Sequence, residues 1–178
     1  MRKKEIWDLI FRYGILILLG TGSLWLFYKI FTPLTIYPAA WILNIFFEAH
    51  VIEDTTTIFF NDIYVSIISA CVAGSAYYLL LIFNLTTPMK KISRIKSIVT
   101  LLGIFLILNI ARIVIFAMLF SVGYKYFDLA HSLTWIIGST IMVVAIWFGN
   151  VWLFGIKEIP IYSDARMIIK SIKKTKAG

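Results

Sequence analysis

The chain contains a long run without a single charged residue, from Ile63 to Met89. About 20 apolar helical residues cross the hydrocarbon core of a bilayer, so this run is long enough to span a membrane. The composition agrees, because 61% of the 178 residues are hydrophobic and only 15% are charged. Soluble domains carry about 25% charged residues. The sequence therefore predicts an all-α integral membrane protein, folded as a single membrane domain over residues 1–178.

Four apolar segments are predicted to form transmembrane helices. The first begins close to the basic N-terminus, and its length indicates a retained anchor rather than a cleaved signal peptide. The third is interrupted by one charge, Arg112, and the only ionisable side chain of the fourth is His131. The predicted spans are Ile10–Phe31, Val65–Thr87, Ser97–Phe120 and Leu129–Gly155, and a basic tail follows at 157–178.

The segment between the first two spans, Thr32–Tyr64, is predicted to begin with a short helix and end in a hairpin. Pro38–His50 is apolar but too short to cross a bilayer, which indicates an interfacial or re-entrant helix. Thr55–Ile67 places β-branched and aromatic residues on both sides of Asn61 and Asp62, a pattern that predicts a β-hairpin.

The basic residues predict the orientation of the chain. There are 17 Lys and Arg, and the net charge is +8. Most of them flank the N-terminus, lie between Lys90 and Lys96, or follow Lys157. Such placement beside apolar spans suits the cytoplasmic side and contact with anionic lipid, and not nucleic acid. Both termini are therefore expected in the cytoplasm, with Thr32–Tyr64 and Ser121–Asp128 on the outer side of the plasma membrane.

Three unusual side chains on three different spans are expected at a similar depth. Cys71, the only cysteine, and Arg112 each lie about 20 residues from the turn that joins their spans, or roughly 30 Å of helix. His131 follows the next turn, on the outer side. An arginine inside a span is costly and usually faces a cavity or a partner. We therefore expect the three side chains to converge toward the outer face.

Four further residues are candidates for the surroundings of this site. Asn109 precedes the arginine by three residues and shares its helical face. Gly74 and Ser75 follow the cysteine by three and four residues, so they line either a pocket or a close helix contact. Asp128 precedes the histidine by three residues and could orient its imidazole, although a solvated loop acid is the simpler interpretation.

A thiol near an imidazole suggests nucleophilic catalysis. His131 would accept the proton of Cys71, because the thiolate is the reactive form. Arg112 stays protonated, so it would serve as an electrostatic stabiliser of the oxyanion and not as a base. No metal and no other cofactor is expected for this chemistry. A single cysteine also excludes an internal disulfide.

Three short motifs stand in order on successive predicted spans. They are ACVAGSAY at Ala70–Tyr77, NIAR at Asn109–Arg112 and LAHS at Leu129–Ser132. With these motifs, the chain over roughly Val65–Gly155 resembles the exosortase/archaeosortase family of membrane transpeptidases, and it looks like a compact archaeosortase-like member. The resemblance implies an active site with Cys71 as nucleophile, Arg112 as electrostatic stabiliser and His131 as base.

The resemblance also implies the class of substrate. Family substrates are exported proteins whose C-terminus carries a short motif, a transmembrane helix and a basic cluster. They are cleaved beside that helix and passed to a membrane lipid or another acceptor, which anchors them at the cell surface. The predicted hairpin could roof the site, or it could pair with an extended substrate by adding a β-strand.

Other functions remain open at this point. A non-enzymatic small membrane protein, such as a transporter subunit or an assembly factor, would use Arg112 to bind an anion and would not need the cysteine. A haem or metal protein would use His50 and His131, although their spacing matches no ligand motif. Intramembrane serine proteolysis fits poorly, because no G-x-S-x-G pattern surrounds Ser75.

Overall fold

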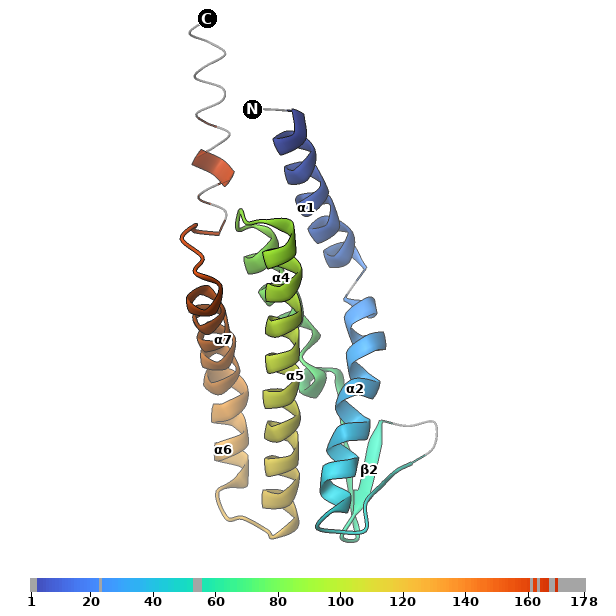
Figure 1. Ribbon diagram of the computed structural model, residues 1–178. Helices are drawn as coiled ribbons and strands as arrows, with labels where there is room; N and C mark the ends of the chain where they lie inside the picture. Colours follow the sequence, from blue (N-terminus) through green and yellow to red (C-terminus); the bar gives the residue numbers. More distant parts are fainter. Residues whose placement is uncertain are drawn as a thin grey trace, which may run out of the picture.

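Long apolar helices dominate the computed structural model, which describes residues 3–22, 24–52, 56–160, 162, 164–166 and 169 (Figure 1). Within these residues three helical segments are long and apolar enough to cross a membrane, so the chain is a multi-pass membrane protein. The third segment is continuous but contains a π-helical stretch in its middle. The segments are α2 (Trp25–Asn44), α5 (Lys91–Ser121), and α6 (Phe127–Leu133) followed by η1 (Thr134–Gly138) and α7 (Ser139–Phe154).

The predicted third and fourth spans, Ser97–Phe120 and Leu129–Gly155, are confirmed as parts of α5 and of the α6–α7 segment. Their outward surfaces are apolar. The exposed fraction is 66% for Ile107 in α5 and 85% for Trp152 in α7. Contiguous apolar surface of this extent would be unfavourable in water and suits contact with lipid.

The first predicted span, Ile10–Phe31, is wrong, because the chain forms two helices there. The helix α1 covers Lys3–Thr21, and the chain then turns before α2 begins. The turn is closed by a 2.9 Å hydrogen bond from the Trp25 N–H to the Gly22 carbonyl. Leu24 has a left-handed backbone with φ of 57°, a conformation that cannot continue a right-handed helix.

The predicted short helix Pro38–His50 is also wrong, because most of it belongs to the longer helix α2. That helix continues through Pro33 and Pro38 and ends at Asn44. Proline removes one backbone donor, and membrane helices tolerate it where neighbouring groups satisfy the freed carbonyl. The spanning helix in this part of the chain therefore lies later than predicted.

The second predicted span, Val65–Thr87, is not one continuous helix. It begins in a strand and continues as two short helices, α3 (Ser69–Val72) and α4 (Gly74–Leu85). Ala73 separates them, with a left-handed φ of 59°. In the described chain the four predicted spans are thus replaced by α1, by three helical segments that could cross a membrane, and by this shorter, broken helix.

A three-stranded antiparallel sheet lies beside the helices, with the strand order β1-β2-β3. The predicted hairpin is confirmed between β2 and β3, although Thr55 lies outside the described residues. Asn61 and Asp62 form its turn with positive φ values of 47° and 59°, as a two-residue type I′ turn requires. The strand β1 was not predicted, because two residues show no alternation. The strands are β1 (His50–Val51), β2 (Thr57–Phe60) and β3 (Ile63–Ser66).

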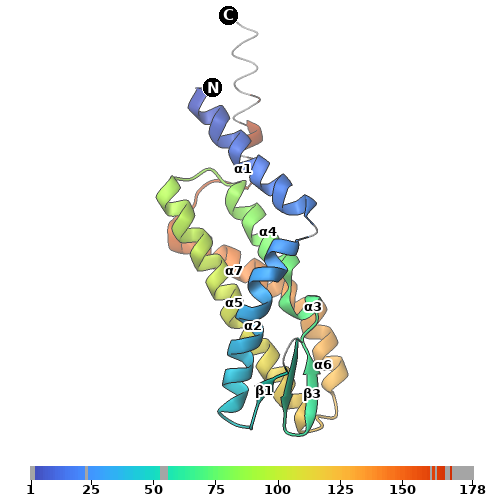
Figure 2. The same ribbon diagram turned by 90° about the vertical axis from the view of Figure 1, so that its right-hand side faces the viewer.

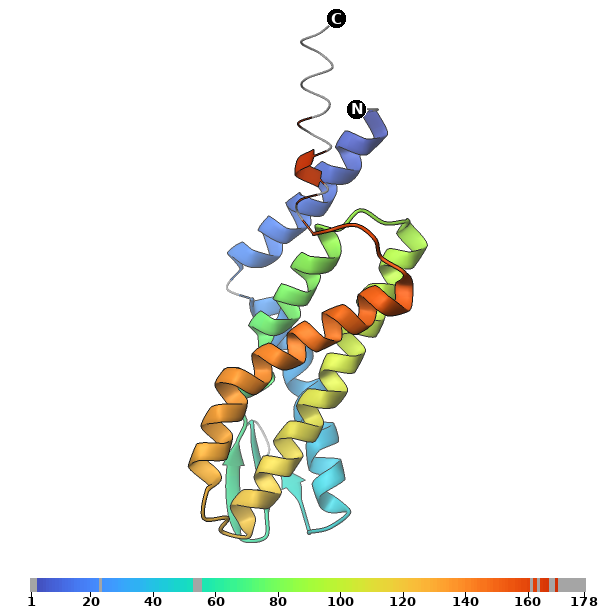
Figure 3. The same cartoon turned by 90° about the vertical axis from the view of Figure 1, so that its left-hand side faces the viewer.

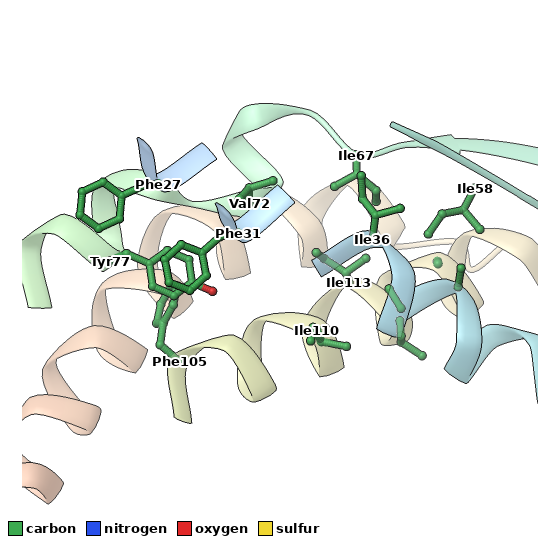
Figure 4. Close-up of a cluster of buried hydrophobic side chains, with 14 of the residues drawn as sticks. Phe27, Phe31, Ile36, Ile58, Ile67, Val72, Tyr77, Phe105, Ile110 and Ile113 are labelled. Atoms are coloured by element: carbon green, nitrogen blue, oxygen red, sulfur yellow. The ribbon is translucent and has the colours of Figure 1, made fainter. Parts of the chain in front are cut away.

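The helix α5 packs against α2, α4 and α7 and forms the centre of the bundle (Figures 1 and 3). Figure 4 shows a part of the hydrophobic core, in which aromatic side chains of α2, α4 and α5 lie together beside aliphatic ones. The Tyr77 ring stacks on Phe31 with centroids 3.7 Å apart and meets the edge of Phe105 at 4.7 Å. These contacts hold α4 firmly between α2 and α5.

The two ends of the bundle differ. The sheet and the α5–α6 turn lie at one end, here called the hairpin end, and α1 and the α4–α5 turn lie at the other, the terminal end (Figure 1). At the terminal end Arg12 is buried and donates to both carboxylate oxygens of Asp164 at 3.1 Å and to the Leu85 carbonyl at 2.8 Å. This cluster joins α1, α4 and the chain beyond α7. Most of the predicted basic tail lies outside the described residues.

Candidate active site

The break between α3 and α4 determines where Cys71 lies. The left-handed backbone of Ala73 interrupts helical hydrogen bonding, and the carbonyls of Cys71 and Val72 turn toward α5. There the Asn109 side-chain amide donates to the Cys71 carbonyl at 2.9 Å and to the Val72 carbonyl at 3.5 Å. Asn109 is fully buried, so it satisfies carbonyls that lipid could not.

Arg112 lies one helical turn after Asn109 on the same face of α5. Its Nη2 donates to the Cys71 carbonyl at 3.4 Å, and its Nη1 donates to Ser139 Oγ at 2.7 Å. Ser139 Oγ in turn donates to the Thr134 carbonyl at 3.4 Å, within the π-helical stretch. A guanidinium has five N–H donors. Within the described chain, these two contacts leave Arg112 with further donors for a ligand.

His131 is held by aromatic rings. Its imidazole stacks on Phe127 at a centroid distance of 5.6 Å and meets the edge of Phe116 at 5.2 Å. In the part of the chain that the structure describes, the imidazole has no hydrogen bond, either to the Cys71 thiol or to another polar group. The ring is therefore oriented by packing, and its two nitrogens remain available.

Cys71, Arg112 and His131 line one cavity of about 490 Å³ near the hairpin end. The structure thus brings together three residues that are far apart in the sequence and come from α3, α5 and α6. Cys71 is a free, partly exposed thiol. The rest of the wall is mostly apolar and comes from β3, the β3–α3 link, α3, α5, α6 and η1. It comprises Tyr64, Val65, Ser66, Ile67, Ile68, Ala70, Ile113, Phe116, Ala117, Phe120, Phe127, Thr134 and Trp135.

Of the four other residues predicted to surround the site, one lies beside it and three do not line the cavity. Asn109 lies directly behind it, through the Cys71 carbonyl. Gly74 faces α2 instead, because a Cβ at this position would lie 2.8 Å from the ring Cζ of Tyr28. Ser75 and Asp128 are exposed and do not line the cavity. Gly74 is therefore a close helix contact, the alternative that its spacing had left open.

Sequence reasoning missed Ser139 and the π-helical stretch before it. A π-helix adds a residue to one helical turn, and such stretches are frequent at functional sites. Here the stretch places Thr134 and Trp135 in the cavity wall and Ser139 against the guanidinium. The small pair Gly138–Ser139 inside a largely apolar span was the signal that the sequence offered.

The second histidine lies elsewhere. His50 is in β1, where its ring meets Phe59 at 5.2 Å, and it borders a separate polar depression with Glu48 and Asp62. The two histidines therefore line different hollows. Among the described residues no three His, Cys, Asp or Glu side chains are grouped closely enough to hold a metal ion.

No protein-family model matches the chain, and no curated protein or solved structure matches it either. The chemistry of the cavity therefore indicates which functions the chain can have. A thiol, an imidazole and a guanidinium along one mostly apolar cavity wall can support covalent thiol chemistry, or the guanidinium alone can bind an anion.

Proposed function

We propose that the protein is a membrane-embedded cysteine transpeptidase or protease that cleaves the C-terminal sorting signal of exported proteins. The observation that carries this proposal is the meeting of Cys71, Arg112 and His131 in one cavity. The order of the three motifs, which resembles the exosortase/archaeosortase family, supports the same assignment.

The reaction begins when His131 takes the proton of the Cys71 thiol. The thiolate attacks the carbonyl carbon of the scissile peptide, and a tetrahedral oxyanion forms. When this intermediate collapses the C–N bond breaks, and the leaving amine takes the proton from the imidazolium. The product is a thioester on Cys71. A lipid or another surface acceptor then attacks the thioester and restores the thiol, or water does so in simple hydrolysis.

Arg112 stabilises the oxyanion with its remaining N–H donors. Its guanidinium is anchored on both sides, by Ser139 Oγ and by the Cys71 carbonyl, so little reorganisation is needed when the charge develops. Charge-assisted hydrogen bonds of this kind are strongest in a site that excludes water. The cavity wall around Arg112 is mostly apolar, which favours such bonds.

The location of the cavity suits a substrate that arrives from outside the cell. The basic residues between Lys90 and Lys96 lie at the terminal end, which the positive-inside rule assigns to the cytoplasm of a plasma-membrane protein. The hairpin end then faces outward, where an exported protein would present its cleavage motif. Its C-terminal helix would lie in lipid beside the bundle.

A second candidate function is a non-enzymatic membrane protein, a transporter subunit or an assembly factor, that binds an anion through Arg112. Two observations favour it. The Arg112 guanidinium has N–H donors beyond those used in its two contacts, and no hydrogen bond joins the Cys71 thiol to His131 in the described chain. Catalytic hydrogen bonds are often formed only in the substrate complex, so the second observation does not exclude the enzyme. The two functions differ in their need for the thiol.

Co-expression with an exported protein that ends in a transmembrane helix and a basic cluster tests the proposal. We expect the wild type to shorten this protein, and Cys71→Ala, Arg112→Ala and His131→Ala to leave it uncut. Ser75→Ala is the matched control, because this exposed residue lies outside the cavity. A thioester-linked adduct in the mass spectrum would identify the cleaved peptide bond. Full processing by Cys71→Ala would overturn the covalent mechanism.

A further inference from the structure

We propose that the substrate binds as an added strand on the free edge of β3, between β3 and α6, and runs parallel to β3 toward Cys71. The inference rests on the proposed function and specifies how the polypeptide is recognised. It follows from the hydrogen-bond phase of the hairpin, from the position of the cavity and from the direction of the chain.

Alternate residues of β3 direct their backbone N–H and C=O groups toward β2 and away from it, and this alternation, the hydrogen-bond phase, shows which groups are free. In an antiparallel ladder, hydrogen-bonded pairs alternate with pairs that are not hydrogen-bonded. The Ile67 N–H donates to the Thr56 carbonyl at 2.8 Å, so Ile67 and every second residue before it point their backbone groups toward β2. Tyr64 and Ser66 are the residues between, and their N–H and C=O groups point away from β2.

The side chains agree with this phase. Side chains lie closer together across a pair that is not hydrogen-bonded. Phe59 and Tyr64 are such a pair in the observed register, and their ring centroids are 4.9 Å apart. Because β3 is at the edge of the sheet, groups that point away from β2 meet no further strand of the described chain.

The free edge borders the cavity. Tyr64 and Ser66 are exposed and line it from one wall, and Phe127 and His131 line it from the α6 wall. Figure 2 shows β3 as the strand of the sheet that lies beside α6. Unpaired donors and acceptors that alternate along an edge are complementary to an extended polypeptide backbone, which adds as a strand.

The direction of the added strand follows from the topology of the proposed substrate. β3 runs from the hairpin turn at Asn61 and Asp62 toward Cys71. An exported protein with a C-terminal membrane helix also runs from the hairpin end inward as it approaches the cut. The two chains are therefore parallel, with the residues before the scissile bond against Ser66 and those further upstream against Tyr64.

Replacing one backbone donor tests the pairing. Ser66→Pro removes an N–H that points to the free edge, and proline is compatible with an edge strand. Ser66→Ala keeps this N–H and removes only the hydroxyl, so it is the reference for the loss of the side chain alone. With a co-expressed exported protein of the tripartite type, we expect processing by Ser66→Pro to be at least tenfold slower than processing by Ser66→Ala. Thiol labelling of Cys71 should be equal in both variants, which shows that the fold is intact.

A disulfide scan tests the direction without requiring turnover. In a Cys71→Ala background, Tyr64→Cys and Ser66→Cys are each combined with single cysteines placed along the segment upstream of the cut. The position that crosslinks best to Tyr64→Cys should lie two residues N-terminal to the position that crosslinks best to Ser66→Cys. The reverse order, or no dependence on position, would overturn the parallel strand.

The outcomes separate this inference from the proposed function. If the wild type cuts the protein through Cys71, and Ser66→Pro cuts it as fast as Ser66→Ala, strand addition is overturned and the enzyme stands. If the wild type and Cys71→Ala both leave the protein uncut, the proposed function is rejected, and the basis for strand addition is lost with it.

Discussion

The side-chain amide of Asn109 donates a hydrogen bond of 2.9 Å to the backbone carbonyl of Cys71. This bond links the helix break before α4 to the central helix α5, and Arg112 reinforces it from the next turn with a 3.4 Å bond to the same carbonyl. The thiol is thus positioned through its own backbone. Asn109 is a positioning residue, and its role is to keep the α3–α4 break in place.

Asn109→Leu should destabilise the protein by about 1–3 kcal/mol, because the Val72 carbonyl loses its side-chain donor and the Cys71 carbonyl keeps only the longer bond from Arg112. The change keeps the side-chain size close to that of asparagine. A lower melting temperature in detergent, with faster thiol labelling of Cys71, is the expected result. Leu108→Ala, at a position 42% exposed on the same helix, is the control and should change the melting temperature little. An unaltered melting temperature in Asn109→Leu would argue against this role.

Arg112→Gln should slow processing by about 10²–10³-fold, because the oxyanion loses its charged partner. Arg112→Lys keeps the charge but cannot bridge Ser139 and the Cys71 carbonyl, so it should recover only part of the rate. Ser139→Ala removes one anchor of the guanidinium and should cost about tenfold, the equivalent of one such hydrogen bond. The rates are compared at equal amounts of folded enzyme. Equal rates for Arg112→Lys and the wild type would contradict the bridging role.

Gly74→Ala should destabilise the contact between α2 and α4 by about 1–3 kcal/mol, because its Cβ would lie 2.8 Å from the Tyr28 ring. Gly103→Ala is a matched control in α5, where an added Cβ meets nothing within 4 Å. It should be neutral or stabilising by about 0.5–1 kcal/mol, since alanine favours a helix. Thermal unfolding in detergent measures both. Adding Tyr28→Ala should reduce the cost of Gly74→Ala, and a purely additive double variant would disprove the clash.

Arg12→Ala should destabilise the terminal end by about 3–5 kcal/mol, because it leaves the carboxylate of Asp164 buried without its partner. Asp8→Ala is the control. Asp8 also pairs with Arg12, at 3.1 Å, but its side chain is 43% exposed, so its loss should cost less than about 1 kcal/mol. Limited proteolysis of the chain beyond α7 measures the effect alongside the melting temperature. If both variants resist the protease equally, the buried pair does not hold this segment.

Ala73→Gly should stabilise the protein by up to about 1 kcal/mol. Alanine in the left-handed region costs about 1–2 kcal/mol, and glycine avoids this cost but loses more backbone entropy on folding. Ala73→Val should be destabilising, because a β-branched side chain suits this region least. The three melting temperatures should rank glycine, alanine, valine. A lower melting temperature for Ala73→Gly would show that the left-handed backbone is not the source of strain.

Much of the candidate site could be predicted from the sequence. The depth of a site residue in the membrane follows from the number of residues between it and the turn that joins two spans. Cys71 and Arg112 are about equally far from the turn that joins their segments, and the structure places the guanidinium against the Cys71 carbonyl. The contact that Gly74 makes with Tyr28 could not be predicted. It depends on how α2 and α4 pack, and spacing along one helix does not report the neighbouring helix.

The apolar runs by themselves determined that the chain belongs in a membrane and that α5 and the α6–α7 segment can cross it, because hydrophobicity over about 20 residues is a local property. The Asn61–Asp62 turn could also be predicted from the sequence, because a turn with two positive φ angles favours asparagine, aspartate and glycine. Only the tertiary structure decided where helices break. Neither Leu24 nor Ala73 is a residue that breaks helices by its own preference, and packing against neighbouring elements overrides that preference. Because the helix breaks at Ala73, a part of this apolar segment lines the cavity and places the Cys71 thiol in its wall.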